Sequence, residues 1–106
     1  MKYSKFVIYM IRHKNRDIQE IYIGSSTNFA RRRSSHKKNV TNRVGKLYQT
    51  KLYKFIRHFG GWDNFVMEIV ESYPCDNDME AKSKEQYYID LHKPHLNSCN
   101  SYNLNI

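Results

Sequence analysis

Two short apolar runs, each carrying one tyrosine, constrain the fold of this chain most strongly. The first spans Val7 to Tyr9 and the second spans Tyr22 to Gly24. Both are rich in residues that favour β-strands, and the polar segment between them contains Asn15 to Asp17, which supplies turn chemistry. The pattern predicts an antiparallel hairpin with strands over residues 5–12 and 20–24.

The rest of the chain predicts three helices and one further strand. A basic helix is expected over residues 28–39, because three polar residues that can cap a helix lie at its start. Apolar residues at three- and four-residue spacing predict a helix over 47–59, and an alternating run predicts a strand over 65–71. A last helix is expected over 79–92. The predicted fold class is α+β, a small three-stranded antiparallel β-sheet flanked by helices in the order β-β-α-α-β-α.

The composition favours a single domain with a polyanionic partner. The 106 residues include 18 Lys and Arg against 10 Asp and Glu, a net charge of +8. Nucleic acid is the simplest partner for this charge, although a solvated basic surface would give the same count. There is no long apolar run or secretion signal, and Cys75 and Cys99 form no CxxC pair. We expect an intracellular protein that is neither secreted nor in a membrane.

The basic helix places an arginine and a histidine on one face. Arg32 and His36 are four residues apart, so they are neighbours on the helix surface. A guanidinium binds two phosphate oxygens at once and stays charged, which suits cleavage of a phosphodiester. His36 could donate a hydrogen bond to the nucleophile or the phosphate. The alternatives are that the arginines simply face water and that His36 is an ordinary surface histidine.

Together these residues resemble the GIY-YIG nuclease family. The resemblance rests, in chain order, on Val7-Ile8-Tyr9, Tyr22-Ile23-Gly24, Asn28-Phe29, Arg32, His36 and Glu85. It runs from about Lys5 to Asn97, and one departure is that the family's first glycine is Val7 here, a position peripheral to the chemistry. The resemblance implies a nuclease catalytic domain over residues 1–97, followed by a polar tail over residues 98–106.

The activity that the resemblance implies is metal-dependent endonucleolytic cleavage of DNA in one hydrolytic step. Tyr9 would activate the attacking water as general base, and Tyr22 would orient the water or the phosphate. Arg32 and a divalent metal on Glu85 would stabilise the developing charge. A single carboxylate leaves most of the coordination shell to water and substrate, which suits Mg²⁺ or Mn²⁺. A salt bridge from Glu85 to a lysine or arginine is the alternative.

The role of general base is demanding for a tyrosine. A phenol has a pKa near 10, so half-ionisation at about pH 8 needs a shift of roughly 2 units, or about 3 kcal/mol. A nearby cation, metal-bound water or Arg32 could supply it. Members of the family have been assigned either tyrosine as base, and our prediction is Tyr9.

Further residues complete the predicted site and its interface with nucleic acid. The resemblance implies a supporting asparagine after the last helix, for which Asn97 fits best and Asn103 is the fallback. The basic residues expected to contact nucleic acid are Arg31, Arg33, Lys37, Lys38 and Lys46. The expected partner is double-stranded or branched DNA, with RNA as a weaker candidate, and a separate recognition domain or partner protein could supply specificity. The alternative function is a non-catalytic basic nucleic-acid-binding module on the same scaffold.

Overall fold

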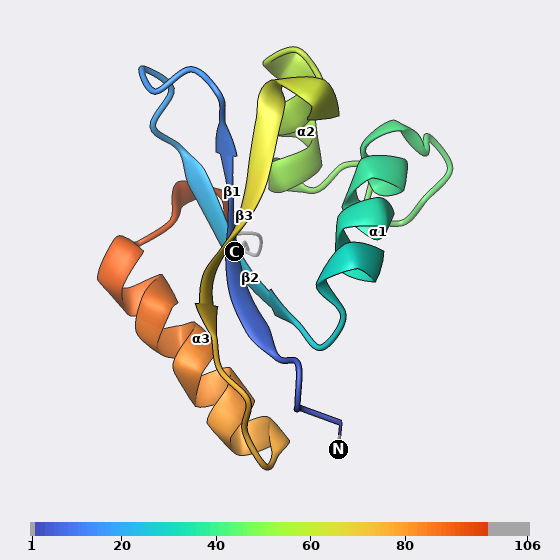
Figure 1. The fold of residues 1–106 in the computed structure, drawn as a ribbon. Helices are drawn as coiled ribbons and strands as arrows, with labels where there is room; N and C mark the ends of the chain where they lie inside the picture. The colour runs from blue at the N-terminus through green and yellow to red at the C-terminus, as the bar shows by residue number, and fades with distance from the viewer. Residues whose placement is uncertain (1, 98–106) are drawn as a thin grey trace, which may run out of the picture.

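A three-stranded antiparallel sheet forms the middle layer of the protein, which the computed structural model describes over residues 2–97 (Figure 1). Its strands are β1 (Val7–His13), β2 (Ile21–Ser26) and β3 (Phe65–Ser72), in the spatial order β2-β1-β3. The central strand β1 pairs antiparallel with both neighbours, and Tyr9 lies opposite Gly24 of β2. The predicted hairpin and the predicted fold class are confirmed.

Helices cover both faces of this sheet (Figure 1). α1 (Phe29–Thr41) and α2 (Lys51–His58) lie on one face, and α3 (Asp78–His92) lies on the other. Two short 3₁₀ turns, η1 (Trp62–Asn64) and η2 (His95–Asn97), precede β3 and follow α3. The predicted tail 98–106 and the fallback residue Asn103 lie outside the described residues.

The alternation of side chains along β1 divides the core between the two faces. Tyr9 and Ile11 point toward α1 and α2, where they pack with apolar side chains of these helices. Ile8 points to the opposite face and packs with Ile23 of β2 and Ala81 of α3. Tyr9 is therefore buried beneath the helix layer that contains the basic residues of α1.

Local polar contacts fix the turn of the hairpin and the start of α1. The Asn15 side chain accepts a hydrogen bond from the Asp17 backbone N–H at 3.0 Å, which closes an Asx turn. Among the three predicted capping candidates, Asn28 is the N-cap, because its side chain accepts the Arg31 backbone N–H at 3.0 Å. Only two residues, Thr27 and Asn28, therefore separate the end of β2 at Ser26 from the start of α1 at Phe29.

The second helix is shorter than its apolar periodicity predicts. It begins at Lys51 rather than near residue 47, and residues 45–50 form consecutive turns. The Arg57 guanidinium donates to the carbonyl oxygens of Val40 and Tyr48, both at 2.7 Å, and lies over the Tyr48 ring at 3.6 Å. These contacts hold the Tyr48 segment in its turn against the end of α1, and spacing along the sequence carries no sign of them.

The length and apolar character of the helices test the prediction that the chain has no membrane span. Over residues 2–97, none combines the length and the apolar character that crossing a membrane requires.

Candidate functional site

A histidine held between two tyrosine hydroxyls forms the centre of the site. The Tyr9 hydroxyl lies 2.7 Å from Nε2 of His36, and Nδ1 of His36 lies 2.7 Å from the Tyr53 hydroxyl. The three residues come from β1, α1 and α2, and each is at most 4% exposed. Both ring nitrogens of His36 therefore bind tyrosines, whereas the sequence suggested a direct contact with the nucleophile or phosphate.

Aromatic rings surround the imidazole and fix its plane. The Trp62 indole stacks on the His36 ring, with centroids 6.2 Å apart and planes 21° apart. The Tyr22 ring meets His36 edge-on at 5.9 Å and lies 6.3 Å from the Tyr9 ring. The two motif tyrosines therefore converge on one histidine, as their positions on paired strands predict.

Gly24 provides the space that the Tyr9 side chain occupies. A Cβ at position 24 would lie 2.6 Å from both Cζ and the hydroxyl oxygen of Tyr9, and 2.9 Å from Cε2 of Tyr22. Among the described glycines only Gly60 and Gly61 have positive φ, so backbone freedom is not the reason for glycine at position 24. Close packing is the reason, because no side chain fits between these two rings.

Burial sets the protonation of the tyrosine–histidine pair. It raises the pKa of Tyr9 far above the ordinary value, and the opposing effect of Arg32 is smaller. Burial, together with the charge of Arg32, lowers the pKa of His36 to about 4. Both groups are therefore neutral at neutral pH. In this state desolvation outweighs the positive charge of Arg32, so Arg32 alone does not bring Tyr9 close to ionisation.

Arg32 stands at the exposed mouth of this buried cluster. It lies on α1, one helical turn before His36. Its positive charge lowers the pKa of Tyr9, His36 and Tyr53. A hollow of about 370 Å³ opens beside it. The hollow is lined mostly by polar groups of the β2–α1 junction and of α1, including Asn28, Arg31, Arg32, Ser35 and Asn39. An anionic group in this hollow would meet the guanidinium of Arg32 close to the buried tyrosines.

Glu85 approaches from the other face of the sheet, across the edge strand β2. Its Oε1 accepts a hydrogen bond from the Ser25 hydroxyl at 2.9 Å, and its negative charge contributes to the raised pKa of Tyr9. Within residues 2–97 no lysine or arginine forms an ion pair with Glu85, and no hydrogen bond reaches its Oε2. The salt-bridge alternative therefore finds no partner in this part of the chain.

The donor set around Glu85 fits a hard divalent cation that keeps most of its water. The described residues contain no cluster of three or more His, Cys, Asp or Glu side chains suited to a metal. Mg²⁺ is commonly held by one or two carboxylates, with water and substrate phosphate filling the remaining positions. The half-buried carboxylate of Glu85, with only Oε1 hydrogen-bonded within residues 2–97, meets this requirement. The described residues do not surround it with enough protein ligands to complete a coordination shell.

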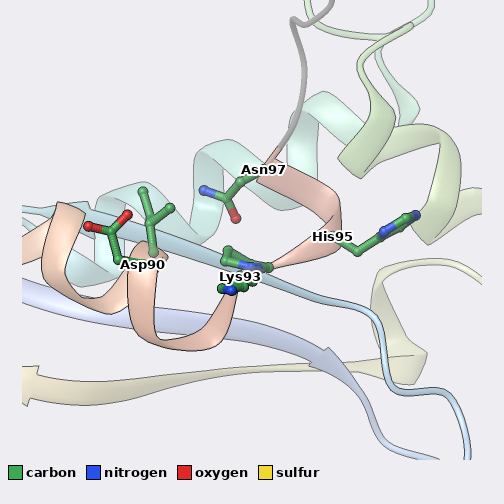
Figure 2. A pocket seen from close by; sticks show the side chains of 6 residues that line it. Asp90, Lys93, His95 and Asn97 are labelled. Atoms are coloured by element: carbon green, nitrogen blue, oxygen red, sulfur yellow. The ribbon is translucent and has the colours of Figure 1, made fainter.

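Asn97 secures the strand that carries Tyr22 and Gly24. Its Oδ1 accepts the Ile23 backbone N–H at 2.8 Å, and its Nδ2 donates to the Ile23 carbonyl at 2.7 Å. This amide acts as a strand partner on the open edge of β2. Figure 2 shows Asn97 in the short turn after α3, where it borders a hollow of about 730 Å³ that also includes Asp90, Lys93 and His95. The predicted supporting asparagine thus holds the strand backbone.

The basic residues predicted to contact nucleic acid lie on the surface of α1 and of the loop that follows it. Arg31, Arg33, Lys37, Lys38 and Lys46 are all exposed. Lys37 and Lys38 border a hollow of about 520 Å³ that extends to Trp62. Their contact with DNA stays a prediction.

Two polar residues of the site, Tyr53 and Ser25, were not predicted from the sequence. Tyr53 was not singled out, because an aromatic residue of the second helix, three positions before Ile56, is expected in the apolar core. Its spacing carries no signal for a polar contact. Ser25, next to Gly24, bears no signal at all, because its partner Glu85 is 60 residues away.

Comparisons with known proteins identify the family and the fold of this chain. The model of the GIY-YIG catalytic domain matches residues 5–103. Among solved structures, the catalytic domain of the homing endonuclease I-TevI shares the fold, with a TM-score of 0.69 at 24% identity over 93% of this chain and 100% of that one. A comparison with curated proteins gave no match. The family match spans nearly the whole chain and includes both tyrosine motifs, so this protein belongs to the GIY-YIG family and has the fold of its nuclease catalytic domain.

Proposed function

We propose that this protein is a metal-dependent endonuclease that hydrolyses DNA phosphodiester bonds in one step. The observation that carries the proposal is the placement of Arg32 beside a buried, hydrogen-bonded Tyr9–His36 pair, with the Glu85 carboxylate close enough to act electrostatically on Tyr9. Membership in a nuclease family supports the reaction type. A scissile phosphate between Arg32 and Glu85 would lie next to the buried pair.

Arg32 binds and stabilises the phosphate in this proposal. Its guanidinium is exposed and borders the polar hollow of about 370 Å³, so a phosphate can reach it. Charge builds up on the phosphate oxygens as water attacks, and a bidentate guanidinium stabilises that charge more strongly than it stabilises the ground state. Arg31 borders the same hollow and holds an adjacent part of the DNA backbone.

Tyr9 accepts the proton of the attacking water while it passes its own proton to Nε2 of His36. The hydrogen bond of 2.7 Å between these groups supports such a relay, which avoids a free phenolate in a site where burial raises the pKa of Tyr9. Tyr9 has no exposed surface in this state, so the relay requires that substrate binding bring water to its hydroxyl. Tyr22, which is only partly buried, orients the water or the phosphate.

Glu85 would hold the divalent cation, Mg²⁺ or Mn²⁺, and Ser25 fixes one of its carboxylate oxygens. The bound ion supplies Lewis-acid stabilisation of charge on the phosphate and on the leaving oxygen. Asn97 keeps β2, and with it Ser25, in position through its two hydrogen bonds to Ile23. DNA, double-stranded or branched, is the proposed partner, and a separate recognition domain or partner protein would supply the choice of target.

A matched pair of arginine variants tests the proposal. Supercoiled plasmid is incubated with Mg²⁺ and with wild type, Arg32→Ala or Arg33→Ala, after circular dichroism has shown that all three are folded. Both variants lose one exposed positive charge of α1, but only Arg32 borders the polar hollow. Nicking should fall about 100- to 1,000-fold in Arg32→Ala and much less in Arg33→Ala. Equal losses would show that these arginines act only as backbone contacts.

A further inference from the structure

We propose that Tyr53 is a positioning residue that, together with Tyr9, holds His36 in the tautomer whose Nε2 lone pair faces Tyr9. The inference rests on the relay proposed above and adds a residue from α2 to it. Tyr53 is 4% exposed, and its hydroxyl is 2.7 Å from Nδ1 of His36. It would act on the reaction only through the imidazole.

The hydrogen bonding of Tyr9 decides between the two tautomers. A neutral imidazole carries one N–H and one lone pair, so His36 can donate to one tyrosine and must accept from the other. Tyr9 has no exposed surface, and within residues 2–97 Nε2 of His36 is the hydrogen-bond partner of its hydroxyl. A buried hydroxyl needs an acceptor for its hydrogen. Tyr9 therefore donates to Nε2, and the proton of the imidazole is on Nδ1.

Tyr53 is suited to accept that proton. Its hydroxyl oxygen has two lone pairs, and it borders the polar hollow of about 370 Å³. The side chain of Asn39, which lines the same hollow, is a second hydrogen-bond partner of this hydroxyl. The hydrogen of the Tyr53 hydroxyl can therefore be directed toward the hollow, outside the Tyr9–His36 pair. Trp62 stacks on the other side of the ring and restrains its plane. Stacking is indifferent to which nitrogen carries the proton, so the two hydroxyls set the tautomer: Tyr9 needs Nε2 as its acceptor, and Tyr53 accepts from Nδ1–H.

The tautomer of His36 decides whether the imidazole can receive the proton of Tyr9. With the proton on Nδ1, Nε2 can receive the proton of Tyr9 as Tyr9 takes one from water, and the resulting imidazolium still donates through Nδ1–H to Tyr53. With the proton on Nε2, the same ring donates to Tyr9 and has no site for its proton. By accepting from Nδ1–H, the hydroxyl of Tyr53 thus stabilises the form of the imidazole that can accept a proton.

The tautomer of wild-type His36 is the direct test, and it needs neither a variant nor activity. Long-range ¹H–¹⁵N correlation spectra of ¹⁵N-histidine protein at about pH 7, where a neutral ring gives different shifts for N–H and lone-pair nitrogens, distinguish the two forms. The inference predicts a protonated Nδ1 and an unprotonated Nε2. Protonation at Nε2 would overturn it, whatever the protein does to DNA.

A conservative variant tests the effect on the reaction. Tyr53→Phe keeps the ring and removes the hydroxyl, and we expect kcat to fall at least about tenfold with little change in KM, together with a mixture of His36 tautomers. Tyr48→Phe is the control, because no hydrogen bond of the Tyr48 hydroxyl occurs within residues 2–97 and its ring contact with Arg57 is kept. Unchanged kcat and tautomer in Tyr53→Phe would contradict the inference. A wild type that cleaves no DNA would instead refute the nuclease proposal, and the spectra would still decide the tautomer.

Discussion

Acidification should destabilise this protein through His36 well before its carboxylates are fully protonated. His36 is 4% exposed, and burial beside Arg32 lowers its pKa to about 4. In the unfolded chain the same imidazole has a pKa of about 6.5. Between these values the unfolded state binds a proton that the folded state does not, so the free energy of unfolding rises with pH and falls on acidification.

The size of the effect follows from the two pKa values. A difference of about 2.5 units corresponds to about 3 kcal/mol when the pH is below both values. By about pH 5 the loss already amounts to about 2 kcal/mol, because the unfolded histidine is then nearly all charged. Domains of this size have a total stability of roughly 5–15 kcal/mol, so the loss is large enough to measure.

Urea unfolding between about pH 7.5 and pH 5, followed by circular dichroism, measures this linkage. Wild type should lose about 2 kcal/mol more over this range than His36→Gln, in which the titrating group is replaced by a neutral amide. Carboxylates titrate equally in both proteins, so the difference between the two slopes isolates His36. Parallel slopes would refute the reasoning and would mean that His36 is solvated in the folded protein.

Two further predictions concern packing and the DNA-binding surface. Gly24→Ala should cost about 1–3 kcal/mol and also reduce cleavage, because the added methyl displaces the Tyr9 ring. Gly61 has a positive φ, but a Cβ there would meet open space, so Gly61→Ala should cost about 1 kcal/mol and leave cleavage unchanged. Equal cleavage by the two folded variants would contradict the role of Gly24. Replacing Lys37 and Lys38 together by alanine should weaken DNA binding and lower the slope of log K against log salt by up to about 2, measured by fluorescence anisotropy. Lys14→Ala, in the hairpin turn, should leave that slope unchanged, and an equal effect would mean that binding follows net charge alone.

Local patterns were sufficient to predict the order of the elements and which candidate site residues lie on which element. The hairpin followed from two β-favouring runs with a turn between them, and the four-residue spacing of Arg32 and His36 placed both on one helix. Asn97 was predicted through the family resemblance, and the structure shows it bonded to Ile23. These features depend on residues close in sequence or on a motif with a fixed order.

Features that depend on packing between distant segments could not be predicted. The contact of Tyr53 with His36 requires α2 to lie at a particular depth against α1, and nothing in the apolar spacing fixes that depth. The same holds for Ser25 and Glu85, which meet across the edge of the sheet. The raised pKa of Tyr9 could not be predicted either, because a nearby arginine is visible in the sequence and burial is not.

The most direct test of the central claim is metal-dependent cleavage by a matched pair of glutamate variants. Wild type, Glu85→Gln and Glu80→Gln are incubated with supercoiled plasmid and with a branched DNA, in Mg²⁺, Mn²⁺ or EDTA at low salt. Glu80 is an exposed residue of the same helix α3, so both variants lose the same charge from one element. The account predicts nicking by wild type and Glu80→Gln with either metal, no nicking in EDTA, and loss of nicking in Glu85→Gln. Nicking in EDTA, undiminished nicking by folded Glu85→Gln, or DNA binding by wild type without cleavage of either substrate would contradict it.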